Sequence, residues 1–500
     1  MSKMPIYHPQ ISVLLKKNIG RSNLANGLPA SQRFTGTQRV IDLTPFIGEN
    51  GRVVVRKSVR APAGMFSVTL ADKMPSFEAE SLYALIEPMD VIEIRMALDT
   101  SVYARAGYEK SMPLMMRGFV TEIGREEAMV GGHDARPSRS IVISGQDYGK
   151  ILTMMQIAYL PNMVTGQNLT TAFKFFLNYT GDMPIFQDAS SFVEGIVSSV
   201  INPFIGEMWS AAASQPVSGG SSPVLGFQVD ATVQNGIVSA VGTNAWPGGT
   251  VYTLLSYFGD VGPWNELFVE DREDAPYIVY RPNPFKDASG NFIQPMATPP
   301  AVNRITNDDI ISVSVDRSDS NVANYYWVDN PRFALNDGAT LQMGIAYQQI
   351  PGEFYLDNYE NCSPKYYGFR QMLVQSQQGP RIDGLKEAAY NKGKSDYFNF
   401  LAKKRQVLMD SNKDNVVWES GRLVLKGNEA IRAGSFLQVQ RGTLAGECYT
   451  VEVTNDFRPF HSYTTSVTYE RGSGFIARSQ MGSRAASPYL AELNLGGVYD

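Results

Sequence analysis

The sequence predicts a β-rich α+β protein in which two small, tube-like antiparallel β-barrel domains are separated by helical and mixed regions. Three segments near the C-terminus, residues 434–442, 447–457 and 462–472, follow one another at turn-sized spacing. From Tyr449 to Thr454 apolar and polar residues alternate, which is typical of an antiparallel strand with one buried face. The 44 glycines and 28 prolines indicate many turns, which suits strands joined by short connections.

The chain of 500 residues is longer than one hydrophobic core usually organises, so we expect roughly two to four domains. Composition and pattern divide it into six regions. They are an N-terminal arm (1–36), a first β-barrel domain (37–147), a helical region (148–262) with an insertion (185–250), a mixed α+β domain (263–410), a second β-barrel domain (411–478) and a C-terminal tail (479–500).

Five strand patterns and one helical stretch make up the predicted first barrel. The helical stretch, 77–86, is closed by Pro88. In the third strand, Ile92 and Ile94 share a face opposite Glu93, as in a half-buried strand. The five strand segments are 52–56, 66–70, 91–96, 116–122 and 140–144.

Three further helices are predicted after this barrel. One covers 148–160 and is stopped by Pro161, a second covers 168–178, and a third covers 395–410. Strand patterns return at 267–269, 277–280 and 311–315.

Residues 185–250 differ in texture, because Ala, Ser, Gly and Val dominate and a Ser-Gly-Gly-Ser-Ser run occupies 218–222. They indicate an insertion, or a helical region joined by a flexible loop. We expect it to be peripheral, partly helical and outside both barrels. Its most apolar stretch, 192–206, could be membrane-active, but Glu194, Pro203 and its short length favour a core or interface helix.

Charge and cysteine usage limit the classes of protein. A net charge of −5 argues against a chain built to grip phosphate backbones. Cys362 and Cys448 allow one long-range disulfide, but two free thiols are favoured in a chain folded in a cytoplasm. The apolar run at 11–15 is too short for a signal peptide, and we expect folding in a cytoplasm.

Motifs for phosphate and metal chemistry are weak. Gly393-Lys394-Ser395 lacks the upstream glycine of a phosphate-binding loop. Residues 472–477 match a dinucleotide fingerprint as letters, but they follow an antiparallel strand and are expected to lead into coil, without the helix that would hold a pyrophosphate. His133, one of only three histidines, lies in a predicted hairpin loop, where simple exposure is favoured over metal binding.

Two clusters remain as candidates for a site. Glu266 and Glu270 could act as an acid/base pair on a sugar, but charges at 270–274 are more typical of a solvated hairpin tip. The aromatic run Tyr325-Tyr326-Trp327 could stack on a ligand, but a core or subunit contact is favoured. The sequence therefore predicts no catalytic residue, no cofactor or cofactor-binding residue, and no metal ligand.

Several segments, taken in order from about residue 40 to 475, resemble the baseplate hub proteins of phage tails. The C-terminal segment ends in Tyr463-Thr-Thr-Ser-Val-Thr-Tyr-Glu-Arg-Gly472, as in the last barrel of such hubs. The other matching segments are 88–93, 116–120, 144–150, 263–268, 280–285, 315–325 and 423–428.

This resemblance implies a contractile-tail-type hub, a virion structural protein of the tail baseplate that is assembled in the bacterial cytoplasm. Such hubs form a homotrimer in which two similar barrels per chain make a ring of pseudo-sixfold symmetry. One face meets the tail tube protein and the other carries the central spike protein. Other baseplate proteins are implied partners, and the tape measure is a further candidate. Viral DNA would pass through the lumen during genome ejection without specific binding, and no stable membrane insertion is implied.

Two other functions stay open beside the hub. An envelope-degrading, tail-associated hydrolase would need a catalytic carboxylate or a Cys/His pair, and a sugar-binding receptor module would need exposed aromatic and acidic clusters. For the hub we expect no enzyme activity, a neutral to acidic lumen, and an N-terminal arm that straps a neighbouring subunit. Isolated chains are expected to be monomeric where the ring needs tube and spike to hold it.

Overall fold

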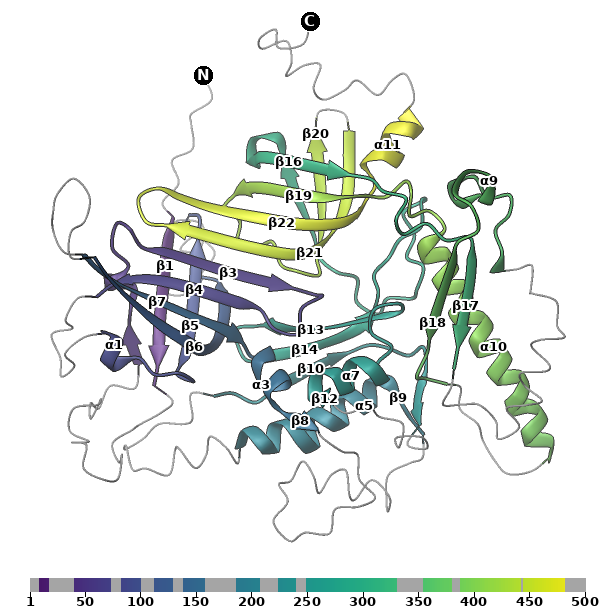
Figure 1. The fold of residues 1–500 in the computed structure, drawn as a ribbon, viewed down its shortest axis with the longest axis horizontal. Helices are drawn as coiled ribbons and strands as arrows, with labels where there is room; N and C mark the ends of the chain where they lie inside the picture. The colour runs from purple at the N-terminus through teal and green to yellow at the C-terminus, as the bar shows by residue number, and fades with distance from the viewer. Residues whose placement is uncertain are drawn as a thin grey trace, which may run out of the picture.

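A computed structural model gives the fold of this protein. The structure describes residues 9–17, 40–72, 82–99, 112–128, 138–157, 186–206, 224–239, 249–330, 354–379, 387–441 and 444–481. Its main feature is a sheet of 13 strands that contains strands from both ends of the chain. The strand order is β16-β19-β22-β21-β3-β4-β7-β6-β5-β1-β2, and β20 and β15 branch from β21. Figure 1 shows its purple N-terminal part beside its yellow C-terminal part.

The N-terminal half-sheet, as we name β1 to β7, is antiparallel throughout. Its core is formed by alternate residues along each strand, which face inward, for example Val53, Val68 and Ile143. A short helix, α1 (Leu82–Leu85), and a 3-10 turn, η2 (Thr44–Phe46), belong to this part. The strands are β1 (Gln10–Lys16), β2 (Val40–Asp42), β3 (Arg52–Ser58), β4 (Met65–Ala71), β5 (Val91–Ala97), β6 (Leu114–Ala128) and β7 (Ser138–Asp147).

The C-terminal half-sheet, as we name the other six strands, has its own core around Leu423, Val453 and Val467. The three strands predicted from the sequence pattern are confirmed as its β20, β21 and β22. The strands are β15 (Val302–Thr306), β16 (Ile310–Asp316), β19 (Glu419–Lys426), β20 (Phe436–Arg441), β21 (Leu444–Arg458) and β22 (Ser462–Gly472), and the 3-10 turn η5 (Asn307–Asp309) lies between the first two.

The two half-sheets repeat one arrangement. In chain order, β1-β3-β4-β5-β6-β7 corresponds to β15-β16-β19-β20-β21-β22, and the pairing order β1-β5-β6-β7-β4-β3 corresponds to β15-β20-β21-β22-β19-β16. Both β6 and β21 have 15 residues. Each carries a bulge at its eighth residue, counted from the strand start, which is Thr121 in β6 and Val451 in β21. One pairing differs, since β1 is antiparallel to β5 whereas β15 is parallel to β20.

A helix follows each repeated hairpin. After β7 comes α3 (Gly149–Met154), and after β22 comes α11 (Gly474–Met481). The expectation of coil after residue 472 is therefore wrong. No parallel strand continues from α11 among the described residues, so the strand–helix–strand unit of a dinucleotide site is not formed there.

A central layer packs against the N-terminal half-sheet. Its three-stranded sheet joins β10 (Gln228–Ala231), β14 (Pro276–Pro282) and β13 (Asn265–Asp271). Its helices are α5 (Ala189–Ile196), which continues as the π-helical turn η3 (Val197–Ile201), and α7 (Val251–Phe258). Two small ladders pair β8 (Gln156–Ile157) with β12 (Gly249–Thr250) and β9 (Phe186–Asp188) with β11 (Ile237–Ser239).

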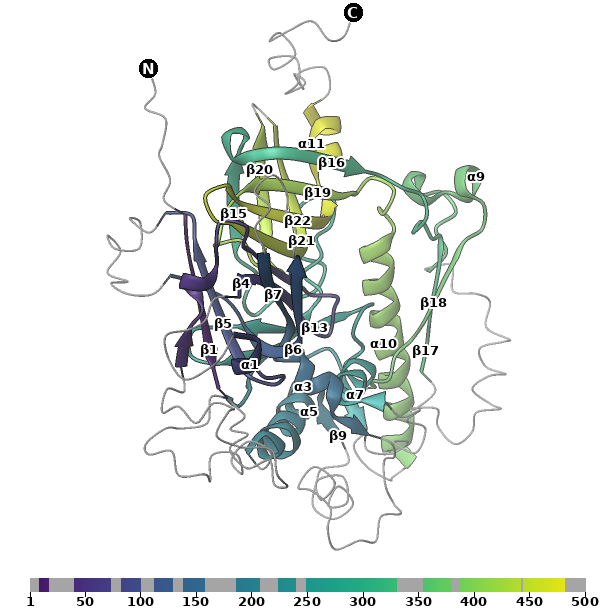
Figure 2. The same ribbon diagram turned by 60° about the vertical axis from the view of Figure 1, so that its left-hand side comes forward.

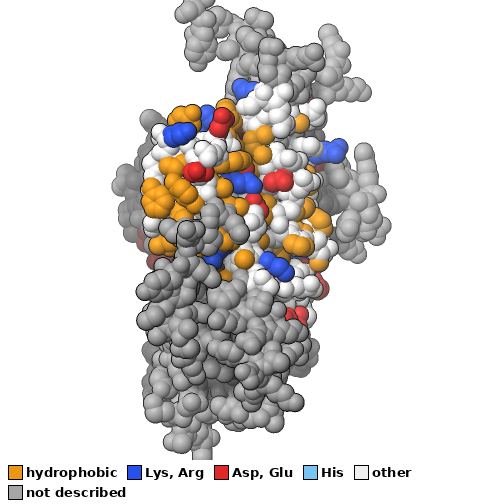
Figure 3. Space-filling view, turned by 90° about the vertical axis from the view of Figure 1, so that its right-hand side faces the viewer, with side chains coloured by type: hydrophobic (Ala, Val, Ile, Leu, Met, Phe, Trp, Pro, Cys, Tyr) orange, Lys and Arg blue, Asp and Glu red, His pale blue; other side chains and the backbone are white. Residues whose placement is uncertain are grey.

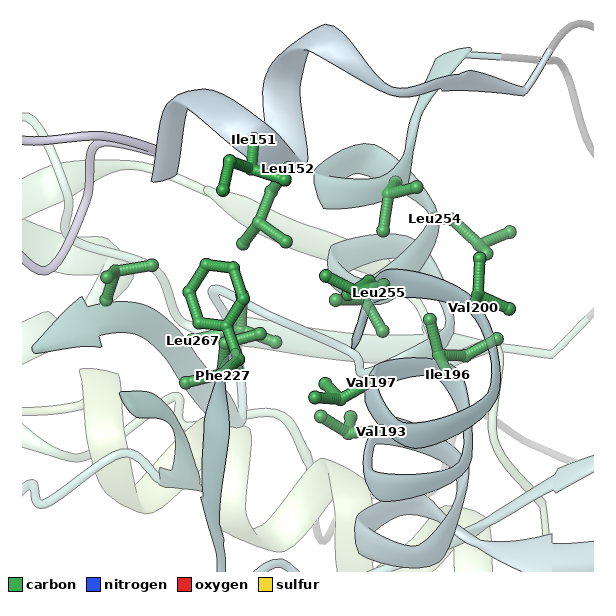
Figure 4. Close-up of a cluster of buried hydrophobic side chains, with 14 of the residues drawn as sticks. Ile151, Leu152, Val193, Ile196, Val197, Val200, Phe227, Leu254, Leu255 and Leu267 are labelled. Carbon is green, nitrogen blue, oxygen red and sulfur yellow. The ribbon is translucent and has the colours of Figure 1, made fainter. Parts of the chain in front are cut away.

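The core of this layer is built from the helices and the sheet together. Figure 4 shows Val193, Ile196 and Val197 from α5 and η3 facing Leu254 and Leu255 of α7. The described part of 185–250 therefore lies outside the 13-stranded sheet and is partly helical, but it is central and not peripheral. This correction follows from burial, because a segment with so many fully buried aliphatic side chains cannot be a surface appendage.

The remaining elements lie between β16 and β19 in the chain. A parallel pair, β17 (Tyr325–Asp329) and β18 (Gln371–Gln375), packs on the long helix α10 (Glu387–Asn412), as Figure 2 shows. The 3-10 turn η7 (Glu360–Cys362) and the short helix α9 (Pro364–Tyr367) complete this part. The predicted helix at 395–410 is confirmed within α10.

Three sets of expectations remain to be compared with the structure: the N-terminal arm, the two barrels, and the helices at 148–160 and 168–178. Gln10–Lys16 is not an arm but an inner strand, paired along its length with β5, and Val13 and Leu15 are buried. The described structure is β-rich and mostly antiparallel as predicted, but the strands expected to form two barrels join in one 13-stranded sheet, and no closed barrel is found among the described strands. The predicted helix at 148–160 ends at Met154 and gives way to β8, while that at 168–178 lies outside the described residues.

Candidate functional site

The joint between the half-sheets is formed by two strands nearly 400 residues apart in the sequence. The C-terminal half of β21 pairs with β3, from Ser58 opposite Glu452 to Val53 opposite Phe457. The N-terminal half of the same edge of β21 pairs with β20. The bulge at Val451 lies where the edge passes from one partner to the other. One long strand therefore serves two partners on one side.

Two ion pairs cross the joint, but they contribute little to its stability. Arg52 lies 2.7 Å from Asp456, and Arg56 lies 2.6 Å from Glu452. Both arginine side chains are about half exposed, so each pair contributes on the order of 0–1 kcal/mol. The backbone ladder and the buried valines of β3 carry most of the joint.

The repeat leaves two edges without a strand partner among the described residues. The first, which we call the β16 edge, is the outer side of Ile310–Asp316, the counterpart of β3. The second, the β6 edge, is the side of residues 122–128 that faces away from β7, the counterpart of the β21 segment that holds β3. On β16, Ile311 and Val315 are 57% and 46% exposed, whereas Val55 at the place of Val315 is 1% exposed. These open edges are the candidate interaction site.

A buried triad connects the N-terminal half-sheet to the central sheet. Lys57 of β3 lies 2.5 Å from both Asp147 of β7 and Asp271 of β13. Burial opposes the charge on Lys57, but the two carboxylates outweigh it and raise the pKa of this lysine. Asp147 also accepts the backbone N–H of Gly149, so it fixes the start of α3.

A second buried junction connects the central sheet to the C-terminal half-sheet. Arg281 donates to Glu266 at 2.6 Å, and the hydroxyl of Tyr449 donates to the other oxygen of Glu266 at 2.5 Å. Arg281 also donates to the carbonyl of Gly434, whose φ of 85° is in the left-handed region that favours glycine. Burial of the group works against the charge on Arg281, but Glu266 outweighs it and raises the pKa of Arg281.

The structure separates the two carboxylates considered as an acid/base pair. Glu266 is buried within the junction just described, with both oxygens engaged. Glu270 accepts from the neighbouring Arg272 at 2.7 Å, near the hairpin between β13 and β14. Both carboxylates are therefore engaged in ion pairs within the fold.

The other sequence candidates have ordinary places in the fold. Tyr326 is fully buried in the core beneath α10, and Arg405 stacks on Trp327 at 3.8 Å, so the core interpretation of this run is confirmed. Cys362 and Cys448 are both buried free thiols, as favoured from the sequence, and burial raises the pKa of Cys362 to about 11. His133 lies outside the described residues.

Two further properties come from the described part of the chain. It holds no group of three or more His, Cys, Asp or Glu side chains arranged to bind a metal ion. None of its helices combines the length and apolar character that crossing a bilayer requires.

One face of the molecule exposes large apolar side chains. Figure 3 shows this face, which carries α9, β17 and β18, with hydrophobic side chains interspersed among charged ones. Tyr366 is 73% exposed, and Phe369 and Leu373 are more than half exposed. Apolar side chains outside any core are a frequent feature of contact surfaces, although single exposed ones are normal.

Sequence signals found the strands that form these edges but not the edges themselves. The alternation at 311–315 correctly predicts a strand. Which side of that strand stays open depends on its pairing with β19, a long-range choice that leaves no local signature.

Comparisons with known proteins give similarities of structure. No protein-family model matches the chain, and no curated protein matches it. The tail protein from Neisseria meningitidis MC58 is 10% identical, with a TM-score of 0.43, over 93% of this chain and 97% of that one. The 43 kDa tail protein of prophage MuSo2 from Shewanella oneidensis is 9% identical, with a TM-score of 0.42, over 88% and 95%.

A chain of the phage P2 baseplate in its activated conformation is 8% identical, with a TM-score of 0.30, over 93% of this chain and 99% of that one. These proteins are tail and baseplate components, the class that the sequence motifs resemble, and the chain is similar to them along most of its length.

Proposed function

We propose that this protein is a structural component of a phage tail, a baseplate hub of which three copies form a ring between the tail tube and the central spike. The observation that carries the proposal is the internal repeat. Two half-sheets with one strand order and one bulge position lie in a single chain. Three such chains present six near-equivalent half-sheets to a sixfold tube and three identical surfaces to a threefold spike.

The open edges supply the contact between copies. Within the chain, β3 adds to the C-terminal half of β21. By the repeat, the β16 edge of one copy adds in the same way to the β6 edge of the next. The register follows from the equivalence: Val315 takes the place of Val55, Arg125 takes the place of Asn455, and so Val315 lies opposite Arg125. Each contact buries apolar β16 side chains and closes two edges.

Charge makes the contact between copies weaker than the joint within a chain. Ser312 and Asp316 stand at the places of Arg52 and Arg56, so the two arginine–carboxylate pairs have no counterpart. Asp316 would instead approach Glu122, a like charge that opposes pairing of free chains. An isolated chain is therefore expected to stay monomeric until tube and spike hold the ring together.

The channel of the ring would let DNA pass during ejection without specific binding. The net charge of −5 supports a wall that does not retain a polyanion.

Disulfide trapping in assembled tail tips tests the register. Val315→Cys combined with Arg125→Cys should give covalent dimers and trimers on oxidation, because residues directly opposite in antiparallel strands lie within disulfide reach. The two native cysteines are buried and should not interfere. Quantification of the tips should give three copies of the chain.

Matched variants control this experiment. Val55→Cys with Asn455→Cys is the same pair within one chain and should oxidise without a gain in mass. Arg125→Cys alone should give no ladder. A ladder that is absent from tips while the in-chain control oxidises, or six copies per tip, would contradict the ring.

Clearing of peptidoglycan distinguishes the hub from the hydrolase alternative, in which Glu266 and Glu270 would be the acid/base pair. Since both are engaged in ion pairs, the purified chain should not clear a peptidoglycan suspension. Clearing that is lost in Glu270→Gln, while the fold is retained, would favour the enzyme.

A further inference from the structure

The Arg471 guanidinium forms no hydrogen bond or salt bridge with the described residues, although Glu470 and Asp414 act on its charge. It stacks on the ring of Phe285 at 3.7 Å, and its Nη1 atom is buried without an acceptor. Arg471 also has a φ of 55°, a left-handed backbone that a non-glycine residue adopts at some cost. Burial, ahead of the opposing effect of Glu470, lowers the pKa of Arg471 to about 10. The neighbouring acids therefore offset the cost of burying this charge only in part.

The nearby acids are engaged elsewhere. Glu470 pairs with Arg60 at 2.5 Å, and Glu447 pairs with Lys286 at 2.5 Å. Asp414 accepts hydrogen bonds of 2.6 Å from a tyrosine hydroxyl and from an asparagine amide. Glu419 accepts from the backbone N–H of Phe475 and interacts with Arg317 and Arg478. Glu470 and Asp414 act on the charge of Arg471, but neither forms a salt bridge with it.

Arg471 lies between two cavities at the meeting point of the C-terminal half-sheet, the central layer and α10. Their volumes are about 340 Å³ and about 320 Å³, and both are lined by Arg471, Phe285 and Trp418. The second is also lined by polar side chains that can donate hydrogen bonds. These are Arg60, Ser318, Asn321, Asn412, Asn415 and Ser420. Acids line the cavities as well, Glu419 and Glu470 in the second and Asp287 and Glu447 in the first.

At the equivalent position of the N-terminal half-sheet, the charged side chain is compensated. Arg471 corresponds to Asp147 of the N-terminal half-sheet, which lies one step beyond the last matched pair of the hairpin. Asp147 is satisfied by Lys57 and by the N–H of Gly149. The C-terminal half-sheet has a cation at this position, a cavity on either side, and no such partner among the described residues.

We propose that Arg471 is the centre of an anion-binding site that takes a carboxylate or phosphate group. A planar guanidinium binds either group through two parallel hydrogen bonds, and the surrounding amides and hydroxyls can complete the shell. The proposal goes beyond the hub function and does not require ring assembly.

Titration of the purified full-length chain tests the site. Calorimetry and thermal melting would be measured with sodium phosphate and, separately, with sodium acetate, each against sodium chloride at equal ionic strength. Saturable binding of one anion per chain, with a rise in melting temperature, is expected for at least one of them. Phosphate alone would indicate a free phosphate or phosphoryl ligand, whereas acetate would indicate a carboxylate, including that of a partner side chain.

Substitution separates binding from a structural role. Arg471→Gln should weaken binding at least about tenfold, since hydrogen bonds to a charged group are lost. Without anion, its melting temperature should equal or exceed that of the parent, because an uncompensated buried charge is removed. Arg471→Lys keeps the charge without the planar fork and should bind with intermediate affinity.

Arg458→Gln is the matched control, because this arginine of the same half-sheet is about half exposed. It should bind as the parent does. The site is refuted by non-saturable behaviour of the parent with both anions. It is refuted equally by the same loss in Arg458→Gln, or by an Arg471→Gln variant that melts lower and binds normally.

Discussion

The N-terminal and C-terminal half-sheets share their strand order, yet corresponding side chains meet different surroundings. Val55 of β3 is buried against β21, whereas Val315 at the equivalent place on β16 is 46% exposed. Asp147 lies in a triad with Lys57 and Asp271, whereas its counterpart Arg471 forms no salt bridge with the described residues. The same local pattern therefore gives an edge strand that is paired in the N-terminal half-sheet (β3) and unpaired in the C-terminal half-sheet (β16).

The difference shows which sides of each half-sheet are held by contacts within the chain. The N-terminal half-sheet is held on two sides, by β21 and by the central layer. The C-terminal half-sheet holds β3 but leaves β16 outward, and its link to the central layer runs through the smaller cluster of Phe268, Phe436 and Tyr449. In the proposed ring, this arrangement leaves one edge of each half-sheet, the β16 edge and the β6 edge, available for the next copy.

The largest effect is expected from one substitution made at both equivalent positions. Val55→Asp places an unpaired charge in a buried joint and should cost about 4 kcal/mol or more of unfolding free energy. Val315→Asp should change the stability of the isolated chain by less than about 0.5 kcal/mol. Urea denaturation measures both.

Incorporation into assembled tail tips is the second measurement on these variants. Val315→Asp should be absent from assembled tail tips, although it folds. Equal stability losses in the two variants would show that the β16 edge is already covered within the chain.

Next in size is the loss of the buried lysine. Lys57→Met leaves Asp147 and Asp271 facing each other without a cation and should cost about 3–5 kcal/mol. Arg317→Met, its counterpart beyond β16, should cost far less, since Arg317 is exposed, stacks on the ring of Phe475 and interacts with Glu419, and does not bridge two buried carboxylates. Thermal melting of the pair decides, and similar losses would remove the asymmetry between the half-sheets.

A core substitution tests whether residues 185–250 are central. Ile196→Ala removes a fully buried side chain of α5 and should cost about 2–5 kcal/mol. Ser198→Ala, on the exposed side of the same helical segment, is the control and should be nearly neutral. Near-neutral behaviour of both would restore the peripheral interpretation.

The smallest expected effect depends on pH. Burial tends to raise the pKa of Glu93, but hydrogen bonds from Lys16 and Arg95 outweigh it and lower this pKa. The group therefore contributes stability above its unfolded pKa of about 4.5, and this is lost as pH falls through the lower folded value. Gln438 stands at the equivalent place in β20.

Glu93→Gln gives the first half-sheet the residue of the second. It should cost about 1–2 kcal/mol at pH 7, and the difference from the parent should shrink below pH 4.5. Chemical denaturation across that range measures it. A difference that is constant with pH would mean that the charge of Glu93 contributes nothing.

Part of the candidate site could be predicted from local pattern. The alternation at 311–315 and the charges at 270–274 correctly located a strand and a hairpin. The joint of β3 with β21 could not, because its register depends on contacts across nearly 400 residues. The unpartnered state of Arg471 depends on the same kind of distant packing.

The sequence by itself determined the strands and the long helix, because period-two and helical spacing of apolar residues are local properties. It located β20, β21, β22 and α10, and it resembled tail hubs in the order of its motifs. It did not reveal that Gln10–Lys16 is an inner strand, since a run of five apolar or small residues suits an arm equally well.

Only the tertiary structure decided which surfaces are sealed. The helices of 185–250 became a core because α7 and Phe227 happen to cover them, and residues with equal propensity would be exposed without that cover. The two half-sheets became one sheet because β3, which pairs with β4 on one side, pairs with β21 on the other. Burial and strand pairing are properties of the assembled chain, so no window of the sequence contains them.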